Sequence, residues 1–304
     1  MSLLTVGSVA FDTIETPFGV AERIVGGSCT YISYAASYFT KNIQVSAVIG
    51  SDFPETELTD FRSRGIDLSG LDIKQDEKSF FWHGRYHTNM NSRDTLETQL
   101  NVLADFQPVL PESYKNAQFL MLGNLTPDIQ MSVIKQMAKR PKFIALDTMN
   151  FWMDIALNPL LKVLKKIDLL IMNEEEARQL SGVHSIKKAA NKILALGPKF
   201  LIIKKGEHGA MLFYKDSIFF APGLPLEEVF DPTGAGDTFA GGFMGYLAAA
   251  KNVSFDTMKR AIIYGSALAS FCVEKFGAEG IKNLTREQIE ARAQEFTKMV
   301  KVKL

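Results

Sequence analysis

Cysteine is scarce in this chain of 304 residues, which has only Cys29 and Cys272. The two lie far apart and in no C-x-x-C pattern, which argues against a structural zinc site and favours free thiols in a reducing compartment. No apolar run is long enough to span a bilayer. The first four residues carry no basic segment of the kind that opens a signal peptide. We therefore expect a cytoplasmic protein with no membrane partner.

An excess of charge of either sign is also missing. Lys plus Arg and Asp plus Glu both number 34, and the formal net charge is zero. Without a basic surface the chain has little to attract a polyanion, so no nucleic-acid partner is expected. The hydrophobic content of 46% is enough for a large core. Because no repeat, low-complexity tract or linker divides the chain, we expect a single domain over residues 1–304.

Two common nucleotide-binding motifs are absent as well. The chain has no G-x-x-x-x-G-K-[ST], and no G-x-G-x-x-G follows a strand-like segment. The first absence excludes a P-loop. The second leaves a dinucleotide-dependent oxidoreductase without its fingerprint.

Strand-like and helical segments alternate regularly from residue 117 onward. Strands are predicted at 119–122, 143–146, 169–172, 200–203 and 210–214, with helices at 128–138, 154–166, 174–180, 186–196, 238–250, 255–273 and 286–300. This order predicts an α/β protein with a parallel sheet covered on both faces. Ligands in such sheets bind at the carboxyl ends of the strands. Segments 11–25 and 71–102 differ from this pattern and are typical of exposed strands.

The segment Asp231-Pro-Thr-Gly-Ala-Gly-Asp237 runs directly into a helical pattern. Its small residues Gly234, Ala235 and Gly236 let backbone N–H groups approach a ligand, and a helix N-terminus favours an anion. Asp237 stands at the edge of this turn, where it can take a proton from a nucleophile. A Gly-rich turn with an Asp cap is also a common helix start with no further role. Both interpretations stay open on these residues alone.

The longer stretch Asp231–Met244 resembles the second signature of the ribokinase-like (PfkB-type) carbohydrate kinase family. Other landmarks of that family stand in the same order: Gly7, Asp12, Gly26-Gly27, Val48–Asp52, Asp147, Asn173-x-x-Glu176 and Gly206-x-x-Gly209. The resemblance extends from Leu3 to about Gly280. It implies a three-layer αβα ribokinase-like core with a mainly parallel sheet. It also implies a small β-sheet lid, formed by about 11–25 and 71–102.

The resemblance implies an ATP-dependent kinase that transfers the γ-phosphate of MgATP to a hydroxyl, usually a primary one, of a sugar or nucleoside. Asp237 would be the catalytic base. The N–H groups of Gly234, Ala235, Gly236 and Asp237 would hold the charge of the phosphate. This division suits phosphoryl transfer, which is catalysed mainly by positioning and charge stabilisation.

Further family positions concern the nucleotide and its ions. Asn173 and Glu176 would act near Mg²⁺ and the phosphates, with Glu176 contacting the metal indirectly, although the pair also fits a helix capping box. The nucleotide would pass Lys205 and the glycines Gly206 and Gly209. A lysine here, Lys204 or Lys205, could touch a phosphate or simply end a strand in solvent. Asp231 is a candidate ligand of a monovalent cation such as K⁺.

On the substrate side, Asp12, Gly26 and Gly27 match positions that contact sugar hydroxyls in the family. Many members carry Asn four residues after the second glycine, where this chain has Tyr31. A phenol offers one hydroxyl and a flat ring in place of an amide. Ribose or fructose specificity therefore does not transfer, and a substrate with a nucleobase gains weight.

The leading hypothesis is a sugar kinase. A nucleoside kinase on the same scaffold is the nearest alternative, and a catalytically silent nucleotide-binding regulator is a third. Some relatives form dimers through the lid, so a homodimer of this kind is a further expectation.

Overall fold

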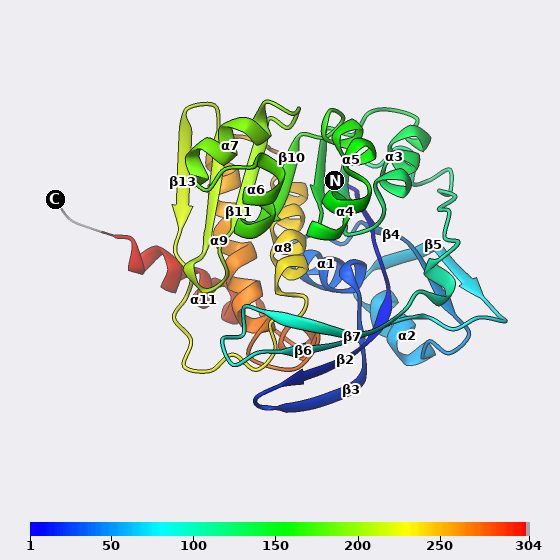
Figure 1. Ribbon diagram of the computed structural model, residues 1–304. Helices are drawn as coiled ribbons and strands as arrows, with labels where there is room; N and C mark the ends of the chain where they lie inside the picture. The colour runs from blue at the N-terminus through cyan, green and yellow to red at the C-terminus, as the bar shows by residue number, and fades with distance from the viewer. Residues whose placement is uncertain (302–304) are drawn as a thin grey trace.

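The computed structural model describes residues 1–301 and contains a large and a small sheet (Figure 1). The large sheet has nine strands in the order β13-β12-β11-β10-β9-β8-β1-β4-β5. Their bounds are β1 Leu3–Val6, β4 Ile43–Gly50, β5 Ile66–Lys74, β8 Phe119–Leu122, β9 Phe143–Asp147, β10 Leu169–Asn173, β11 Phe200–Lys204, β12 Ala210–Tyr214 and β13 Ser217–Ala221. In this spatial order, all neighbouring strands from β11 to β5 pair in parallel, and β12 and β13 add an antiparallel edge.

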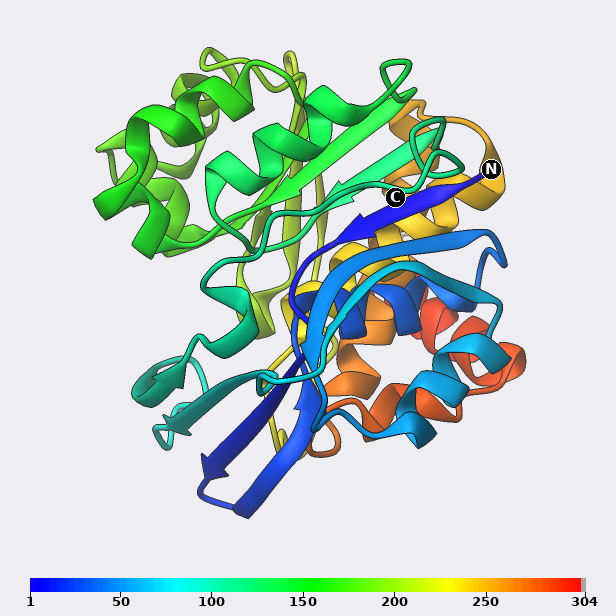
Figure 2. The same ribbon diagram turned by 90° about the vertical axis from the view of Figure 1, so that its right-hand side faces the viewer.

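Helices cover both faces of this sheet, as Figure 2 shows from the side. One face packs against α1 Ser28–Ser37, α2 Glu55–Ser63, α8 Ala235–Ala250 and α9 Phe255–Cys272, with α10 Glu279–Lys282 and α11 Arg286–Met299 further out. The other face packs against α3 Pro127–Gln136, α5 Leu157–Leu164, α6 Glu174–Ser181 and α7 Ile186–Leu194, with α4 Asn150–Ile155 beside them. Strands buried on both faces need apolar side chains throughout, which explains runs such as Leu3–Val6. The expected three-layer αβα core is confirmed.

The small sheet has the strand order β3-β2-β6-β7. Its strands are β2 Ala10–Thr16, β3 Gly19–Gly26, β6 Phe80–Tyr86 and β7 Arg93–Gln99. Strands β2 and β6 run in parallel, and the outer pairs are antiparallel. Figure 1 places this sheet next to α1 and the start of α8, at the carboxyl-end side of the large sheet.

The second lid segment is shorter than predicted. Residues 71–74 belong to β5, which pairs with β4 at the edge of the large sheet, and Asn101–Leu103 form a short 3-10 turn. An edge strand is paired on one side only and has half of its side chains in solvent. Its sequence therefore looks like that of the exposed strands that follow it.

Two further boundaries differ from the sequence-based prediction. The helix expected at 154–166 is two helices, α4 and α5, because Ala156 between them has a non-helical φ of −139°. Strand β13 was not predicted. It follows a tight turn in which Lys215 has a φ of 50°. Within residues 1–301, no helix is long and apolar enough to cross a bilayer.

Candidate active site

Residues 231–237, called the anion turn here, end in the first turn of α8. Gly234 precedes the helix with a φ of 73°. The N–H of Ala235 donates to Pro232 O at 3.2 Å, and that of Thr238 donates to Gly234 O at 2.8 Å. No acceptor among residues 1–301 pairs with the N–H groups of Gly234, Gly236 and Asp237. Of the four groups expected to hold a phosphate, Ala235 is therefore already engaged in closing the turn, and three are available.

Two glycines of the anion turn lie close to side chains from other elements. A Cβ on Gly234 would fall 2.4 Å from the ring of Tyr31. One on Gly236 would fall 2.8 Å from Nζ of Lys204. The turn thus lies between the ring of Tyr31, which leaves no space for a side chain at Gly234, and the ammonium at the end of the flexible Lys204 side chain.

Tyr31, predicted to contact the substrate, lies directly beneath the anion turn. Its side chain is 1% exposed, beneath the anion turn, because α1 and α8 pack closely together. Its hydroxyl has no hydrogen-bond partner among residues 1–301. Burial, together with the nearby carboxylates of Asp12, Asp231 and Asp237, raises the pKa of Tyr31 well above its usual value. The phenol therefore stays neutral and supports the turn from below.

Lys204 and Asp147 form an ion pair at the shared carboxyl edge of β11 and β9. Nζ lies 3.2 Å from Oδ2, and both side chains are largely buried. Burial opposes the charge of the ammonium, but Asp147, Glu176 and Asp237 outweigh this and raise the pKa of Lys204. The ammonium lies against Gly236, at the positive end of the α8 dipole, where a cation is unfavourable without an anion. Two sources of positive potential therefore meet in one small space.

Lys205 lies elsewhere, which corrects the choice between the two lysines. Its Nζ pairs with Glu174 at 2.7 Å, at the start of α6. Consecutive residues at a strand end point to opposite sides, so only one of them can reach the anion turn. Gly206 and Gly209 bracket a 3-10 turn with φ of 55° and 96°. A Cβ on Gly209 would fall 2.0 Å from Ala221 O, so this loop stays close to the neighbouring strand.

Asn173 and Glu176 form a reciprocal capping box at the start of α6. Asn173 N donates to Glu176 Oε2 at 2.7 Å, and Glu176 N donates to Asn173 Oδ1 at 2.8 Å. Burial raises the pKa of Glu176 to about 7, with Lys204 opposing and Asp147 adding to the shift. The sequence-based alternative of a structural cap is thus present, and the charges of Lys204 and Asp147 also act on this carboxylate.

This donor set fits Mg²⁺ bound mainly through phosphate. Within residues 1–301, no group of three or more His, Cys, Asp or Glu side chains could hold a metal ion alone. Mg²⁺ commonly keeps several waters and binds proteins through one or two carboxylates plus substrate phosphates. Glu176 and Asp147 supply carboxylates of that kind beside the anion turn.

Asp237 stands in the first turn of α8, facing the same space. Its pKa is raised to about 7, first by burial and then by Asp147, while Lys204 and Arg93 lower it. A base with a pKa near neutrality takes up a proton readily and also releases it.

The substrate-side residues converge on the carboxylate of Asp12, which is 5% exposed. Burial, and after it the charge of Asp231, raises the pKa of Asp12 to about 7. A Cβ on Gly26 would fall 1.9 Å from Asp12 Oδ2. Gly27 has a φ of 91°, and a Cβ there would meet Ser8 O at 2.5 Å. The absence of a side chain at Gly26 therefore leaves the space that the Asp12 carboxylate occupies.

Asp231 anchors the anion turn to the loop after α9. Its two oxygens accept from Thr233 N and Gly277 N, both at 2.8 Å, and its side chain is fully buried. These amides account for the carboxylate without a cation. A role in binding K⁺ remains a proposal.

The sequence analysis expected the small sheet as a lid but did not foresee that Tyr86 contacts the anion turn. Tyr86 accepts from Thr233 Oγ1 at 3.2 Å, directly on the anion turn. The tip of the β2–β3 hairpin also contacts the loop that leads into the anion turn, since the rings of Phe18 and Phe230 are 4.8 Å apart. The small sheet is therefore closed over the site. No periodicity in its sequence indicated these long-range contacts.

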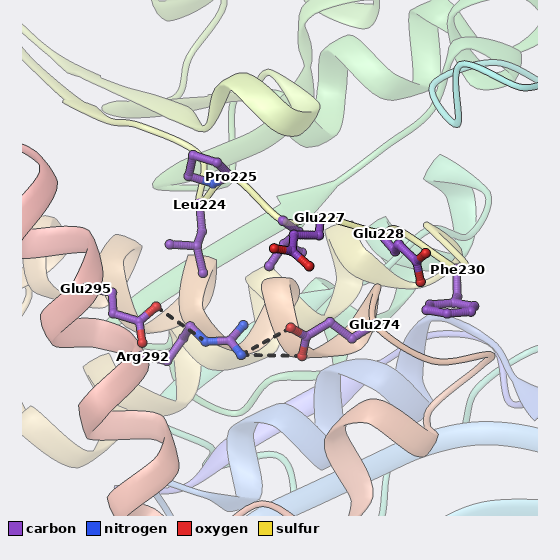
Figure 3. A pocket seen from close by; sticks show the side chains of 9 residues that line it. Leu224, Pro225, Glu227, Glu228, Phe230, Glu274, Arg292 and Glu295 are labelled. Atoms are coloured by element: carbon purple, nitrogen blue, oxygen red, sulfur yellow. Dashed lines mark hydrogen bonds and ion pairs between the residues drawn. The ribbon is translucent and has the colours of Figure 1, made fainter.

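A hollow of about 410 Å³ lies beside the loop that leads into the anion turn (Figure 3). Its lining is Leu224–Glu228, Phe230, Glu274, Arg292 and Glu295. Arg292 pairs with Glu274 at 3.2 Å and approaches Glu295 at 3.9 Å. None of the residues predicted for catalysis lines it, so this hollow is not the reaction centre.

Comparison with known proteins identifies relatives along most of the chain. The chain is 29% identical over 249 residues to the cytidine kinase of Thermococcus kodakarensis, covering 80% of this chain and 87% of that protein. It is 34% identical over 238 residues to the 2-dehydro-3-deoxygluconokinase of Thermoproteus tenax, covering 73% of each. The crystal structure of Methanocaldococcus jannaschii nucleoside kinase superimposes with a TM-score of 0.77 at 20% identity, covering 97% of this chain and 99% of that one.

The family model of the pfkB family carbohydrate kinases matches residues 20–284. This range includes the glycine pair, the capping box and the anion turn, whose geometry is described above. The chain therefore belongs to the pfkB family of carbohydrate kinases and is an ATP-dependent phosphotransferase that acts on an alcohol group.

Proposed function

We propose that this kinase phosphorylates a primary hydroxyl of a small sugar held between Asp12 and Asp237. The observation that carries the proposal is the meeting of Lys204 with the N-terminus of α8. The ammonium lies 2.8 Å from the Cβ position of Gly236, next to unpaired backbone N–H groups. The positive end of the α8 dipole and the ammonium both attract an anion, and a phosphate group bound to these N–H groups would lie beside the Lys204–Asp147 ion pair.

The roles of the residues follow from their positions. MgATP supplies the phosphoryl group, and its metal offsets phosphate charge. Asp237 accepts the proton of the substrate hydroxyl as the oxygen bonds to the γ-phosphorus and ADP departs. The three free N–H groups of the anion turn and Lys204 stabilise the charge on the transferred group. Asp12 orients the substrate by accepting from its other hydroxyls.

A nucleoside is the second candidate substrate, and Trp82 favours it. A Cβ on Gly84 would fall 2.0 Å from the Trp82 ring, so the indole lies flat on the small sheet. Trp82 pairs in register with Asp12 of β2, so this flat surface lies beside the carboxylate that we propose binds the substrate. The similarity to a cytidine kinase supports the same substrate class. Tyr31, whose flat ring first suggested a nucleobase, lies against Gly234, and its buried hydroxyl has no partner among residues 1–301.

The test is ADP release from MgATP across pentoses, hexoses, 2-dehydro-3-deoxygluconate, cytidine and inosine. We expect at least one alcohol to be phosphorylated, and Asp237→Asn to lower kcat by about 10²–10⁴-fold. Turnover of nucleosides alone would replace the simple-sugar proposal with the second candidate. Tight ATP binding without turnover of any alcohol would favour the regulator. Unchanged activity of Asp237→Asn would contradict the base assignment.

Three further properties belong to the proposal. Asp231 is proposed as a K⁺ ligand, tested by comparing rates in KCl and in tetramethylammonium chloride. A homodimer through the small sheet is supported by β7, whose outer edge pairs with no strand within residues 1–301 and whose seven residues are all exposed, including Leu96 at 42%. Light scattering measures its mass. A cytoplasmic location is tested by cell fractionation.

A further inference from the structure

Gln130 of α3 lies at the carboxyl ends of β8 and β9, and only 1% of it is exposed. Its Nε2 donates to Gly123 O at 3.0 Å and to Asp147 O at 3.4 Å. Each of these carbonyls comes one residue after the last pair in the register of the two strands, Leu122 with Leu146. One side-chain amide therefore ties the strands together just beyond the point where their own pairing ends.

The partners of this amide fix its orientation. Both are carbonyls, which can only accept, so the NH₂ group must face them and Oε1 must point away. Oε1 is buried and has no hydrogen-bond partner among residues 1–301. An apolar side chain of similar size would leave no buried oxygen unpaired. Packing alone therefore does not account for a glutamine here, whereas a need for two N–H donors does.

The peptide bond between Asp147 and Thr148 connects Gln130 to the phosphate site. Its carbonyl accepts from Gln130, and its N–H, which is the backbone N–H of Thr148, donates to Asp147 Oδ1 at 3.0 Å. Because a peptide unit is planar, a hydrogen bond that fixes the carbonyl also fixes the direction of the N–H. The carboxylate held by this N–H pairs with Lys204 at 3.2 Å. The Lys204 ammonium in turn lies 2.8 Å from the Cβ position of Gly236 in the anion turn.

We propose that Gln130 is a positioning residue for phosphoryl transfer, which orients the Asp147 carboxylate toward Lys204 through the 147–148 peptide. This inference rests on the proposed function. Without the amide, the peptide plane can turn, and the carboxylate and the ammonium that it holds lose their fixed place beside the anion turn. Displacement of a reacting or charge-stabilising group by about 1 Å can lower a rate by about 10²-fold, even when its cause lies far from the reaction.

Gln130→Met removes both N–H donors and keeps the length of the side chain. Gln136→Met is the matched control on the same helix, because its amide donates to Pro108 O at 2.8 Å and accepts from Leu110 N at 2.9 Å, outside the site. We expect Gln130→Met to lower kcat by about 10–10²-fold and Gln136→Met to leave it near that of the wild type. Hydrogen exchange of the Thr148 amide, followed by NMR, should become faster in Gln130→Met only.

A double-mutant cycle with Asp147→Asn separates positioning from general support of the fold. If Gln130 acts through the Asp147 carboxylate, Gln130→Met should lower kcat little further once Asp147→Asn is present. A residue that only supports the fold would lower kcat by the same factor in both backgrounds. Urea unfolding shows whether each variant is folded under assay conditions, and Gln130→Leu repeats the cycle with a second apolar side chain.

Two results would overturn the inference: equal losses of kcat from Gln130→Met with and without Asp147→Asn, or unchanged exchange of the Thr148 amide in Gln130→Met. Failure of the proposed function is distinguishable from this, because amide exchange and the calorimetric affinity for MgADP need no turnover. If no alcohol is phosphorylated, but Gln130→Met speeds the exchange and weakens MgADP binding only when Asp147 is present, the positioning role stands without the kinase activity.

Discussion

The ring of Tyr31 lies directly beneath Gly234, so that a Cβ on the glycine would fall 2.4 Å from Cε1 and Cζ of the ring. The main chain of the anion turn therefore rests on an aromatic floor supplied by α1. The shape of the phosphate site depends on this contact as well as on the glycines of the turn.

Gly234→Ala should reduce both stability and activity. The residue has a φ of 73°, which costs a non-glycine residue about 1–2 kcal/mol. The overlap with Tyr31 adds about 1–3 kcal/mol, typical of overpacking. Gly182→Ala is the matched control, because Gly182 has a φ of 67° and nothing lies within 4 Å of its Cβ position. Urea unfolding of the two variants separates the conformational cost from the overlap. Equal losses of stability would contradict the role of Tyr31.

Lys204→Met should raise KM for ATP and lower kcat by about 10²-fold, because the anion turn loses its ammonium. It should also raise the pKa of Asp237, which Lys204 lowers, and so shift the acidic limb of the rate profile to higher pH. Lys205→Met removes only a pair with partly exposed Glu174 and should leave kcat near that of the wild type. A larger defect in Lys205→Met than in Lys204→Met would reverse the assignment of the two lysines.

The rate should rise with pH through about 7, because Asp237 must be ionised to accept a proton and its pKa is about 7. The profile of kcat/KM between pH 5 and 9 reports this value for the free enzyme. Asp12 has a pKa of about 7 as well, so the limb can be steeper than that of one group. In Asp237→Asn the residual rate should lose the part of the pH dependence that comes from ionisation of Asp237. A flat profile in the wild type would argue against a carboxylate base.

The buried acids should make the ligand-free protein less stable as the pH rises from about 4 to 7. In the unfolded chain Asp237 has its ordinary pKa of 3.8, against about 7 in the fold. Between these values the folded protein binds more protons than the unfolded chain, so the free energy of unfolding decreases with pH.

Asp237→Asn should therefore gain stability over the wild type at pH 8 relative to pH 4. Urea unfolding at several pH values measures the difference, with Asp76→Asn, at an exposed turn, as the control. A difference that does not change with pH would mean that Asp237 keeps an ordinary pKa in the fold.

Local patterns in the sequence determined the α/β class and the carboxyl-end location of the site. Runs of apolar residues predicted the strands because a sheet covered on both faces needs them, and the glycines of the anion turn predicted a helix start that favours an anion. The β5 segment was placed in the lid, since an edge strand and a lid strand have the same half-exposed pattern. Nothing within one segment distinguishes them.

Tertiary structure decided which side chains meet. The sequence places Lys204 and Lys205 side by side, but only the pairing of β10 with both β11 and β9 brings Lys204 to Asp147, while Lys205 meets Glu174. Tyr31 stands at the position where the family resemblance implies a residue that contacts the sugar, and close packing of α1 against α8 buries its side chain. Arg93 belongs to a polar hairpin and lies over the rings of Trp82 and Tyr86 only through the pairing of β6 with β7. A sequence pattern is set by neighbours along the chain, whereas charge, burial and pKa depend on neighbours in space.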